Sequence, residues 1–360
     1  MSTFGIEEEF FLLDPASGLP AVPDEGTRKR LMSIRAGASE SQHELLDCQV
    51  EMATPVCSAS HEALASLRRF RQNLATTASA SNLVAVSMGA APLMSEGSAT
   101  IAPVERYRKI HRYLPGISSQ QYVSGMHVHV AITDSEAGIL ALNGLRRWLP
   151  ILVAIGANSP YWRGMDTGFA SWRSIHYRMW SVQGIQPYFA GPEDYYKFLS
   201  QVLGSDVVLD AGHIGWAARL SHNYPTVEIR VADAQLRAAD SVALALAIRA
   251  LVETSVHQPL PESGLRSELL DLATWQAAKH GLDGNQLDPE TGRSVSPERM
   301  VGALLRRIGD ALEESGDKEE VEAALSRMLA DGNGARLQRE SLAFGGLLGV
   351  VTNAAALLVE

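Results

Sequence analysis

The fold is first indicated by the segment GMHVHVAI, residues 125–132. His127 and His129 stand two residues apart and alternate with Val128 and Val130, which predicts a strand with imidazoles on one face and an apolar opposite face. Imidazole is the commonest metal ligand among protein side chains. The pattern therefore predicts a strand that separates a hydrophobic core from a candidate metal site.

A second strand near the N-terminus carries carboxylates in the same pattern. In GIEEEF, residues 5–10, Glu7 and Glu9 fall on one face of the predicted strand. An isolated pair of this kind is usually a solvated face. Glu8 falls on the face that should be buried, so we expect it either at the rim of the sheet or at a bulge in the strand.

A third strand, TVEIRVAD at residues 226–233, repeats the arrangement. Glu228 and Arg230 share one face, and the other face is entirely valine and isoleucine. A cross-strand ion pair would explain this pair alone. Three such strands in one chain predict a sheet with an apolar face for helices and a polar face that gathers carboxylates, imidazoles and a guanidinium.

Composition restricts the class of protein. Of the 360 residues, 46% are hydrophobic and 20% are charged, as in soluble globular proteins, so disorder over most of the chain is excluded. The balance of 31 Lys+Arg against 41 Asp+Glu gives a net charge of −10, which makes nucleic acid an improbable partner. Cys48 and Cys57 are the two cysteines, too few for a disulfide scaffold or a cysteine-rich zinc fold, and we expect both in the core.

The order of elements predicts an α+β fold. The length allows about two domains of roughly 150 residues or one large one. We expect a single catalytic domain over residues 1–360, with a β-rich part at 1–235 and a helical layer at 236–360. The expected strands are 4–13, 47–54, 83–88, 122–132 and 226–232. The expected helices begin at residue 60 and otherwise span 136–157 with a break near Pro150, 242–256, 263–280, 297–314, 318–330 and 336–343.

Two segments bear on location. The N-terminal MSTFGIEEEF has neither the basic nor the apolar region of a secretory signal. The segment from Leu342 to Val359 approaches the length of a membrane span, but Asn353 lies inside it and it lacks an aromatic belt. We therefore expect a buried C-terminal helix, no membrane partner and a cytoplasmic protein.

The chemistry of the three strands favours phosphoryl transfer. Several carboxylates with one or two imidazoles suit Mg²⁺ or Mn²⁺ better than zinc. Arginine is a planar, always charged partner for a phosphate in transfer. No Walker A sequence is present, so ATP, if bound, is bound by another fold. The segment 159–186 is rich in aromatic residues, arginine and glycine and is predicted to be a long functional loop.

At this point a family resemblance becomes specific. The quoted strands, together with VEMATPV at 50–56 and SPYWRGMDTGFASWR at 159–173, resemble in sequence and order the carboxylate–amine ligases of the glutamate–cysteine ligase type 2 family. The resemblance implies the glutamine-synthetase-like fold, a curved antiparallel sheet that forms a funnel backed by helices. It also implies ATP-dependent amide formation through an acyl phosphate, with amino acids as the small-molecule substrates, glutamate and cysteine as the favoured pair, and a homodimer.

The resemblance implies two bound divalent ions. One ion, Mg²⁺ or Mn²⁺, would be held by Glu9, Glu44 and Glu51, and the other by Glu7, His127 and Glu228. Glu44 lies too far before Glu51 for one continuous strand to place both on one face, so a bend near residues 45–47 must intervene. Asp47 is the alternative ligand.

The resemblance also implies the groups that contact substrate. His129 would face the ATP phosphates, and Arg230 would bind and stabilise the phosphoryl group in transfer. Arg173 and Arg219 would contact phosphate or a substrate carboxylate.

Two other functions remain open at this stage. A metal-dependent hydrolase would use His127 and His129, although such a motif normally ends an early strand of a βα repeat. A degenerate ligase would bind ATP or an amino acid without turnover, although all candidate ligands are present.

Overall fold

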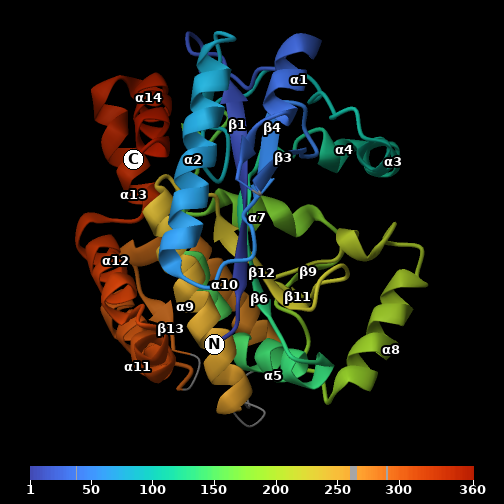
Figure 1. Ribbon diagram of the computed structural model, residues 1–360, viewed down its shortest axis with the longest axis vertical. Coiled ribbons are helices and arrows are strands. Elements are labelled where there is room, and N and C mark those ends of the chain that lie inside the picture. The colour runs from blue at the N-terminus through green and yellow to red at the C-terminus, as the bar shows by residue number, and fades with distance from the viewer. Residues whose placement is uncertain (38, 260–265, 289–290) are drawn as a thin grey trace.

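An eight-stranded antiparallel sheet runs through the middle of the molecule (Figure 1). The computed structural model describes residues 1–37, 39–259, 266–288 and 291–360. The strand order is β11-β12-β6-β1-β4-β3-β2, and β5 also pairs with β1. Its strands are β1 Phe4–Leu13, β2 Arg35–Ala36, β3 Ser39–His43, β4 Gln49–Ala53, β5 Val84–Val86, β6 Gly125–Ala131, β11 Ala218–Leu220 and β12 Thr226–Asp233. Short two-stranded pairs lie outside it: β7 Tyr161–Trp162 with β8 Met165–Asp166, β9 Gln183–Gly184 with β10 Gly215–Trp216, and β13 Gln286–Leu287 with β14 Ser294–Val295.

Helices cover one side of this sheet, with further helices outside them (Figure 1). Helices α2 and α9 pack on the sheet, and α11 and α12 pack on α9. In the first two thirds of the chain the helices are α1 Glu25–Met32, α2 Ser60–Ser79, α3 Glu105–Tyr113, α4 Pro115–Ser118, α5 Ser135–Leu145, α6 Leu149–Ile155, α7 Trp172–His176 and α8 Pro192–Leu203. Those of the last third are α9 Ala238–His257, α10 Ser267–His280, α11 Pro297–Ser315, α12 Lys318–Asp331, α13 Gly334–Ser341 and α14 Gly346–Leu358. The expected α+β fold is confirmed; the expected start of α10 at Ser263 lies outside the described residues.

The strands divide the molecule as their alternation predicts. Val128 and Val130 of β6 are fully buried and join the main core, together with the apolar face of β12 and residues of α2 and α9. In β1 the face of Glu7 and Glu9 continues into Phe11 and Leu13, which are buried in a second hydrophobic cluster near α14. One face of β1 is therefore polar at one end of the strand and apolar at the other.

Glu8 lies neither at the rim of the sheet nor at a bulge, so both expectations for it were wrong. It is fully buried on the helical side, where Arg71 of α2 donates from Nε to Oε2 over 3.0 Å and from Nη2 to Oε1 over 2.7 Å. The Ser241 hydroxyl of α9 also donates to Glu8. A buried carboxylate is tolerated here because a bidentate arginine and a hydroxyl satisfy it.

The expected break near Pro150 is present. Helices α5 and α6 meet at an angle of 67°, and Pro150 lies in the first turn of α6, where its missing N–H is harmless. The C-terminal helix α14 has 13 residues, because Gly345 and Gly346 take positive φ values and end the preceding turn. Within the described ranges, no single helix is long and apolar enough to cross a membrane, and only the bent pair α5–α6 passes by length and composition.

Candidate active site

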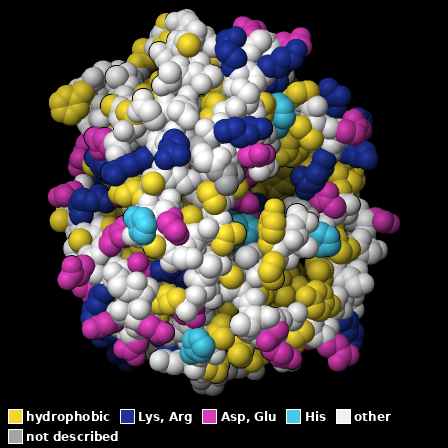
Figure 2. All heavy atoms as spheres, in the orientation of Figure 1, with side chains coloured by type: hydrophobic (Ala, Val, Ile, Leu, Met, Phe, Trp, Pro, Cys, Tyr) yellow, Lys and Arg dark blue, Asp and Glu magenta, His cyan; other side chains and the backbone are white. Residues whose placement is uncertain are grey.

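A cavity of about 830 Å³ opens on the polar side of the sheet. Figure 2 shows the hollow, with histidine and charged side chains around it. Its floor comes from β1, β4, β6 and β12, and its walls come from α3, α8 and the loops 173–183 and 210–224. All ten candidate residues line it: Glu7, Glu9, Glu44, Glu51, His127, His129, Arg173, Arg219, Glu228 and Arg230.

Three carboxylates form the first cluster. Glu9 and Glu51 are directly opposite each other in the register of β1 and β4. Glu44 follows the end of β3, and one oxygen of each carboxylate lies within 4.8 Å of the other two. The chain does bend after Glu44. Asp47 is not an alternative ligand, because Arg28 donates from Nε to its Oδ1 over 2.8 Å and holds it away from the cavity.

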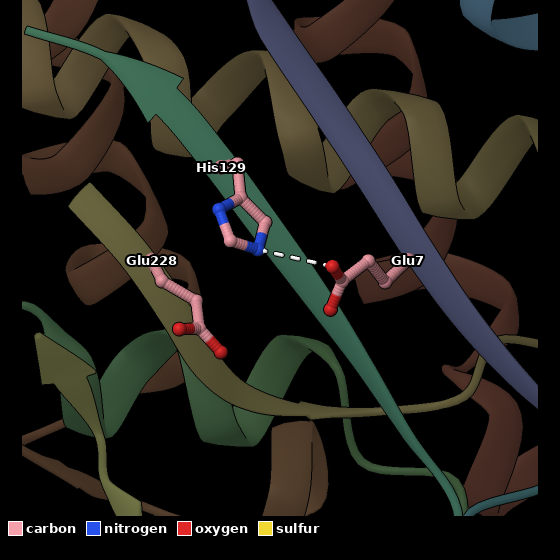
Figure 3. Close-up of side chains that lie close together, drawn as sticks. All are labelled: Glu7, His129 and Glu228. Atoms are coloured by element: carbon pink, nitrogen blue, oxygen red, sulfur yellow. Dashed lines mark ion pairs between the residues drawn. The ribbon is translucent and has the colours of Figure 1, made fainter. Parts of the chain in front are cut away.

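Glu7 connects the other ligand candidates. It lies opposite His127 in the register of β1 and β6, and its Oε2 is 3.1 Å from His127 Nδ1. Its Oε1 is 3.3 Å from His129 Nε2 (Figure 3). Potential ligand atoms of Glu7, His129 and Glu228 gather in one group, and those of Glu7, Glu51 and His127 gather in another. The structure thus groups Glu228 with His129, whereas the resemblance paired it with His127.

Two arginines enclose Glu228. Arg219 donates to its carboxylate from Nε over 2.7 Å and from Nη2 over 3.2 Å, and Arg230 donates from Nη1. The Nη1 of Arg219 is also engaged by the carbonyl oxygens of Ala211 and Ile214. Every nitrogen of Arg219 therefore has a protein partner. By contrast, Arg230 Nε is buried without a hydrogen-bond partner in the described part of the chain, and remains a free donor.

The long segment 159–186 contributes to the cavity, as expected of a functional loop. It contains β7, β8, α7 and β9, and α7 carries Arg173 into the cavity wall. Tyr177, Trp180 and Gln183 follow Arg173 there. Trp162 and Trp172 are not among the lining residues; they pack against each other at 6.4 Å between ring centroids and hold the loop down.

Electrostatics divide the carboxylates into two kinds. Burial raises the pKa of Glu9 to about 8, and the charge of Glu44 acts in the same direction. Burial also raises the pKa of Glu44. Burial raises the pKa of Glu51 as well, and the charges of Glu44, Glu7 and Glu9 act in the same direction. Burial disfavours the charged form of Glu7 too, but hydrogen bonds from His127 and His129 outweigh it and lower its pKa.

The remaining two groups have clear charge states. Burial opposes ionisation of Glu228, but the charges of Arg230 and Arg219 outweigh it and lower the pKa of the carboxyl. Burial, followed by the charge of Arg230, lowers the pKa of His127 to about 4. His127 is therefore a neutral imidazole at pH 7, the form in which histidine binds metals.

These residues fit a divalent cation. In the described part of the chain, no Lys or Arg pairs with Glu9, Glu44 or Glu51. Glu9 is buried and the other two are half-buried, and the three adjacent carboxylates disfavour one another's charge. A hard cation with oxygen ligands would compensate them. The two groups that contain Glu7 each combine one imidazole with two carboxylates, and this set of ligands also suits Mg²⁺ or Mn²⁺.

Sequence reasoning did not identify several lining residues. Tyr107 of α3 donates from its hydroxyl to the His43 carbonyl over 3.1 Å and lies 3.5 Å from Glu44. Arg106 and Asp210 form an ion pair at 2.9 Å between α3 and the loop after α8. The available signal was the amphipathic pattern of residues 105–113, in which apolar Ile110 stands among charged residues. In the structure Ile110 is the buried residue of this helix.

Comparison with known proteins identifies the family. Glutamate-cysteine ligase family 2 (GCS2) matches residues 3–354. A Nocardia farcinica protein named "Putative glutamate--cysteine ligase 2-1" is 39% identical over 348 residues, which cover 95% of this chain and 89% of the relative. A Streptomyces coelicolor protein named "Putative glutamate--cysteine ligase 2" is 35% identical over 354 residues, covering 97% and 96% of the two chains.

Solved structures share the fold at low sequence identity. A glutamate–cysteine ligase from Francisella tularensis in complex with AMP has a TM-score of 0.71 at 11% identity and covers 100% of this chain and 89% of its own. A bifunctional glutathione synthetase from Pasteurella multocida has a TM-score of 0.68 at 14% identity, over 99% of this chain and 52% of its own. The family match spans nearly the whole chain. The protein therefore belongs to glutamate–cysteine ligase family 2, a family of ATP-dependent carboxylate–amine ligases.

Proposed function

We propose that the protein uses ATP to join the γ-carboxylate of glutamate to the amine of cysteine. One observation carries the proposal: a single cavity gathers a cluster of three carboxylates, a second cluster of Glu and His, and three arginines on one face of an antiparallel sheet. These are the groups that phosphoryl transfer requires for charge compensation and positioning. The names of the relatives support glutamate and cysteine as the pair.

Two divalent cations fit the carboxylates. Glu9, Glu44 and Glu51 would hold one, and Glu7 would help to hold the other with His127, His129 and Glu228. Bound there, the cations would offset the negative charge of the ATP phosphates. Arg219 orients Glu228, since its nitrogens are already engaged, and Arg230, which lines the cavity, would offer its guanidinium to a phosphate oxygen. Arg173 would contact the phosphate or the substrate carboxylate.

The reaction would take place in two steps. A carboxylate oxygen of glutamate attacks the γ-phosphorus, a new O–P bond forms, and the bond to the bridging oxygen breaks to release ADP. The amine of cysteine then attacks the acyl carbon of the acyl phosphate, inorganic phosphate leaves with the C–O bond electrons, and the amine loses one proton. Arg230 would stabilise the charge on the phosphoryl oxygens in the first step.

A substrate screen tests this function. ADP and phosphate release would be measured with ATP, Mg²⁺ and pairs of amino acids, and the product of glutamate plus cysteine would be identified by mass. Turnover should require Mg²⁺ or Mn²⁺ and should not be supported by Zn²⁺. Turnover that persists after thorough chelation would contradict the two-cation site, and amide formation from another pair only would replace the substrates.

The two other functions have less support. A barrel hydrolase needs its histidines at the end of a strand in a βα repeat, whereas His127 and His129 lie within a central strand of an antiparallel sheet. A degenerate ligase would lack part of the site, whereas all ten candidate residues line the cavity. The homodimer and the cytoplasmic location remain proposals, which size-exclusion chromatography with light scattering and cell fractionation would test.

A further inference from the structure

Several contacts fix the position of Arg173, which lies in the short helix α7. Its side chain is 6% exposed, and its Nη2 donates to the carbonyl oxygen of Arg230 over 3.2 Å. Its guanidinium lies over the ring of Tyr177, 5.3 Å from the centroid. Its own backbone N–H donates to Ser159 Oγ over 3.0 Å. The side chain thus has a fixed direction into the cavity.

Asp233 at the end of β12 organises the backbone that carries Arg173. Its Oδ2 accepts from the Asn158 N–H over 2.8 Å and from the Ser159 hydroxyl over 2.6 Å, and its Oδ1 accepts from the Ser171 hydroxyl over 2.9 Å. Arg173 Nη1 lies 3.9 Å from Oδ1. Asp233 is 1% exposed and does not line the cavity. It therefore acts on the site only through other residues.

Gly125 supplies the space for the guanidinium. It is opposite Asp233 in the register of β6 and β12, and a Cβ added to it would lie 2.3 Å from Arg173 Nη2 and 2.8 Å from Cζ. Its N–H donates to Glu9 Oε2 over 2.8 Å. The obstructing atoms are the far end of a flexible side chain, so a methyl group here would displace Arg173 while the backbone could stay in place.

We propose that Gly125 and Asp233 are positioning residues of the ligase reaction: Asp233, with Ser159 and Ser171, fixes the origin of the Arg173 side chain, and Gly125 leaves the space that its guanidinium occupies. This inference rests on the proposed function, in which Arg173 contacts phosphate or substrate carboxylate. Misplacing such a group by about 1 Å can lower a rate by about 10²-fold. The register of β6 and β12 thereby sets the position of the Arg173 guanidinium, which comes from α7.

A cycle of variants tests the steric part. Gly125→Ala should lower kcat by about 10²-fold in the wild-type background, and by less than about 3-fold in an Arg173→Gln background, because the displaced group is already gone. Gly309→Ala is the matched control, since a Cβ at Gly309 meets nothing within 4 Å. Additive losses, or an unchanged rate in Gly125→Ala, would overturn the proposal.

Ser171→Ala tests the Asp233 network with little risk to the fold. It removes one donor to Asp233 and also the N-cap of α7, since the Ser171 hydroxyl accepts from the Ser174 N–H. It should reduce kcat more than it raises KM for ATP, while the midpoint of thermal unfolding falls by no more than the loss of one helix cap explains. Ser171→Thr keeps the hydroxyl and should restore most of the rate. A loss that follows the unfolding midpoint and is not restored by Thr would show a merely structural role.

Two readouts separate this inference from the proposed function. Binding of a non-hydrolysable ATP analogue with Mg²⁺, measured by calorimetry, and the unfolding midpoint of the four cycle proteins need no turnover. Gly125→Ala should lower the midpoint less when residue 173 is Gln. If this coupling holds but the wild-type protein makes no γ-glutamylcysteine, the proposed substrates are wrong, and the positioning role of Gly125 and Asp233 stands. If the wild-type protein makes the product, but the effects of Gly125→Ala and Arg173→Gln on rate, analogue binding and unfolding midpoint are all additive, only the positioning role is wrong.

Discussion

At the scale of single residues, the carboxylates of the cavity are held in two different ways. Glu228 has arginine partners and stays charged, whereas Glu9, which is buried, and Glu51, which is half-buried, lie beside other carboxylates. Without a cation, protons must take over part of the compensation. Proton and metal binding therefore compete at the same oxygens, which links metal affinity and stability to pH.

The sign of this pH dependence follows from Glu9. Its pKa is raised from 4.5 to about 8, so the metal-free folded state holds a proton that the unfolded chain has released. The stability that this proton supports is complete below about pH 4.5 and is lost as the pH rises through about 8. In the presence of a chelator, the midpoint of thermal unfolding should fall as the pH rises through this window, and the fall should be smaller in Glu9→Gln. An equal slope in both proteins would contradict the assignment.

Arg230→Lys should not behave as a conservative change. A planar guanidinium can hold two phosphoryl oxygens, and an ammonium cannot. Since Arg173 shares the task, we expect a loss on the order of 10²-fold in kcat with little change in ATP affinity. Rapid-quench measurement of ADP formation checks it, with exposed Arg108→Lys as the control. A wild-type rate in Arg230→Lys would leave Arg230 only as the ion partner of Glu228.

Glu228→Ala should abolish turnover while the fold persists. The change removes a candidate metal ligand and leaves Arg219 and Arg230 without their shared carboxylate. Glu228→Gln should retain the shape and raise the Mg²⁺ concentration needed for half-maximal rate. Circular dichroism and steady-state kinetics would be compared with Glu193→Ala, an exposed glutamate on α8. Normal kinetics in Glu228→Ala would remove this residue from the site.

At the scale of elements, the clearest sequence predictions were the long strands. Strands β6 and β12 alternate apolar and polar residues from Met126 to Val130 and from Thr226 to Val231, whereas β1 departs from alternation at Glu8; the bounds of all three match the expected ones within a few residues. β3, with the sequence SESQH, was missed because it has no apolar residue, although Ser39 and Ser41 are buried. Its polar pairing with β4 depends on neighbours that local periodicity cannot reveal.

The sequence predicted which strand residues share the floor of the cavity, whereas Glu44, Arg173 and Arg219 were expected there only from the family resemblance. Pairs at i and i+2 identify a face, so Glu7, His127 and Glu228 could be found from spacing alone. Tyr107 and Arg106 reach the cavity only because α3 packs beside the segment after β3, which is a tertiary fact. The partner of Glu8 could not be predicted either, since Arg71 lies on a helix 63 positions away in the sequence.

The buried ion pair of Glu8 on β1 and Arg71 on α2 gives a prediction about stability. Arg71→Met should lower the free energy of unfolding by about 3–5 kcal/mol, because it leaves the Glu8 carboxylate buried and unpaired. Glu8→Leu combined with Arg71→Met should recover part of the loss, because the Gln235 and Leu236 carbonyls, which accept from Arg71, stay unpaired. Urea unfolding would measure it, with exposed Arg69→Met on the same helix as the control. A double variant no more stable than Arg71→Met would show that the pair does more than satisfy charge.

At the scale of the whole molecule, the cation sites join distant parts of the chain. Glu7, Glu44, Glu51, His127 and Glu228 come from four strands and one loop. Cations that bind only the folded form should therefore stabilise the entire protein, by about 2.7 kcal/mol at 100 times Kd for one site. Calorimetry with Mg²⁺ and with chelator measures the shift, and Glu51→Gln should reduce it. An equal shift in that variant would locate the effect elsewhere.

The position of β1 in the sheet has a consequence for synthesis on the ribosome. Although it is the first strand made, it lies between β6 and β4, and its buried Glu8 is also contacted by Ser241 of α9. Both strand neighbours of β1 are complete by residue 131, but the nascent chain must hold the Glu8 carboxylate without Ser241 until about two thirds of the polypeptide has emerged. Pairing over such sequence distances is slow. The apolar residues of an unpaired strand invite aggregation, which charges within the strand oppose by repulsion, and β1 carries three consecutive glutamates, Glu7, Glu8 and Glu9.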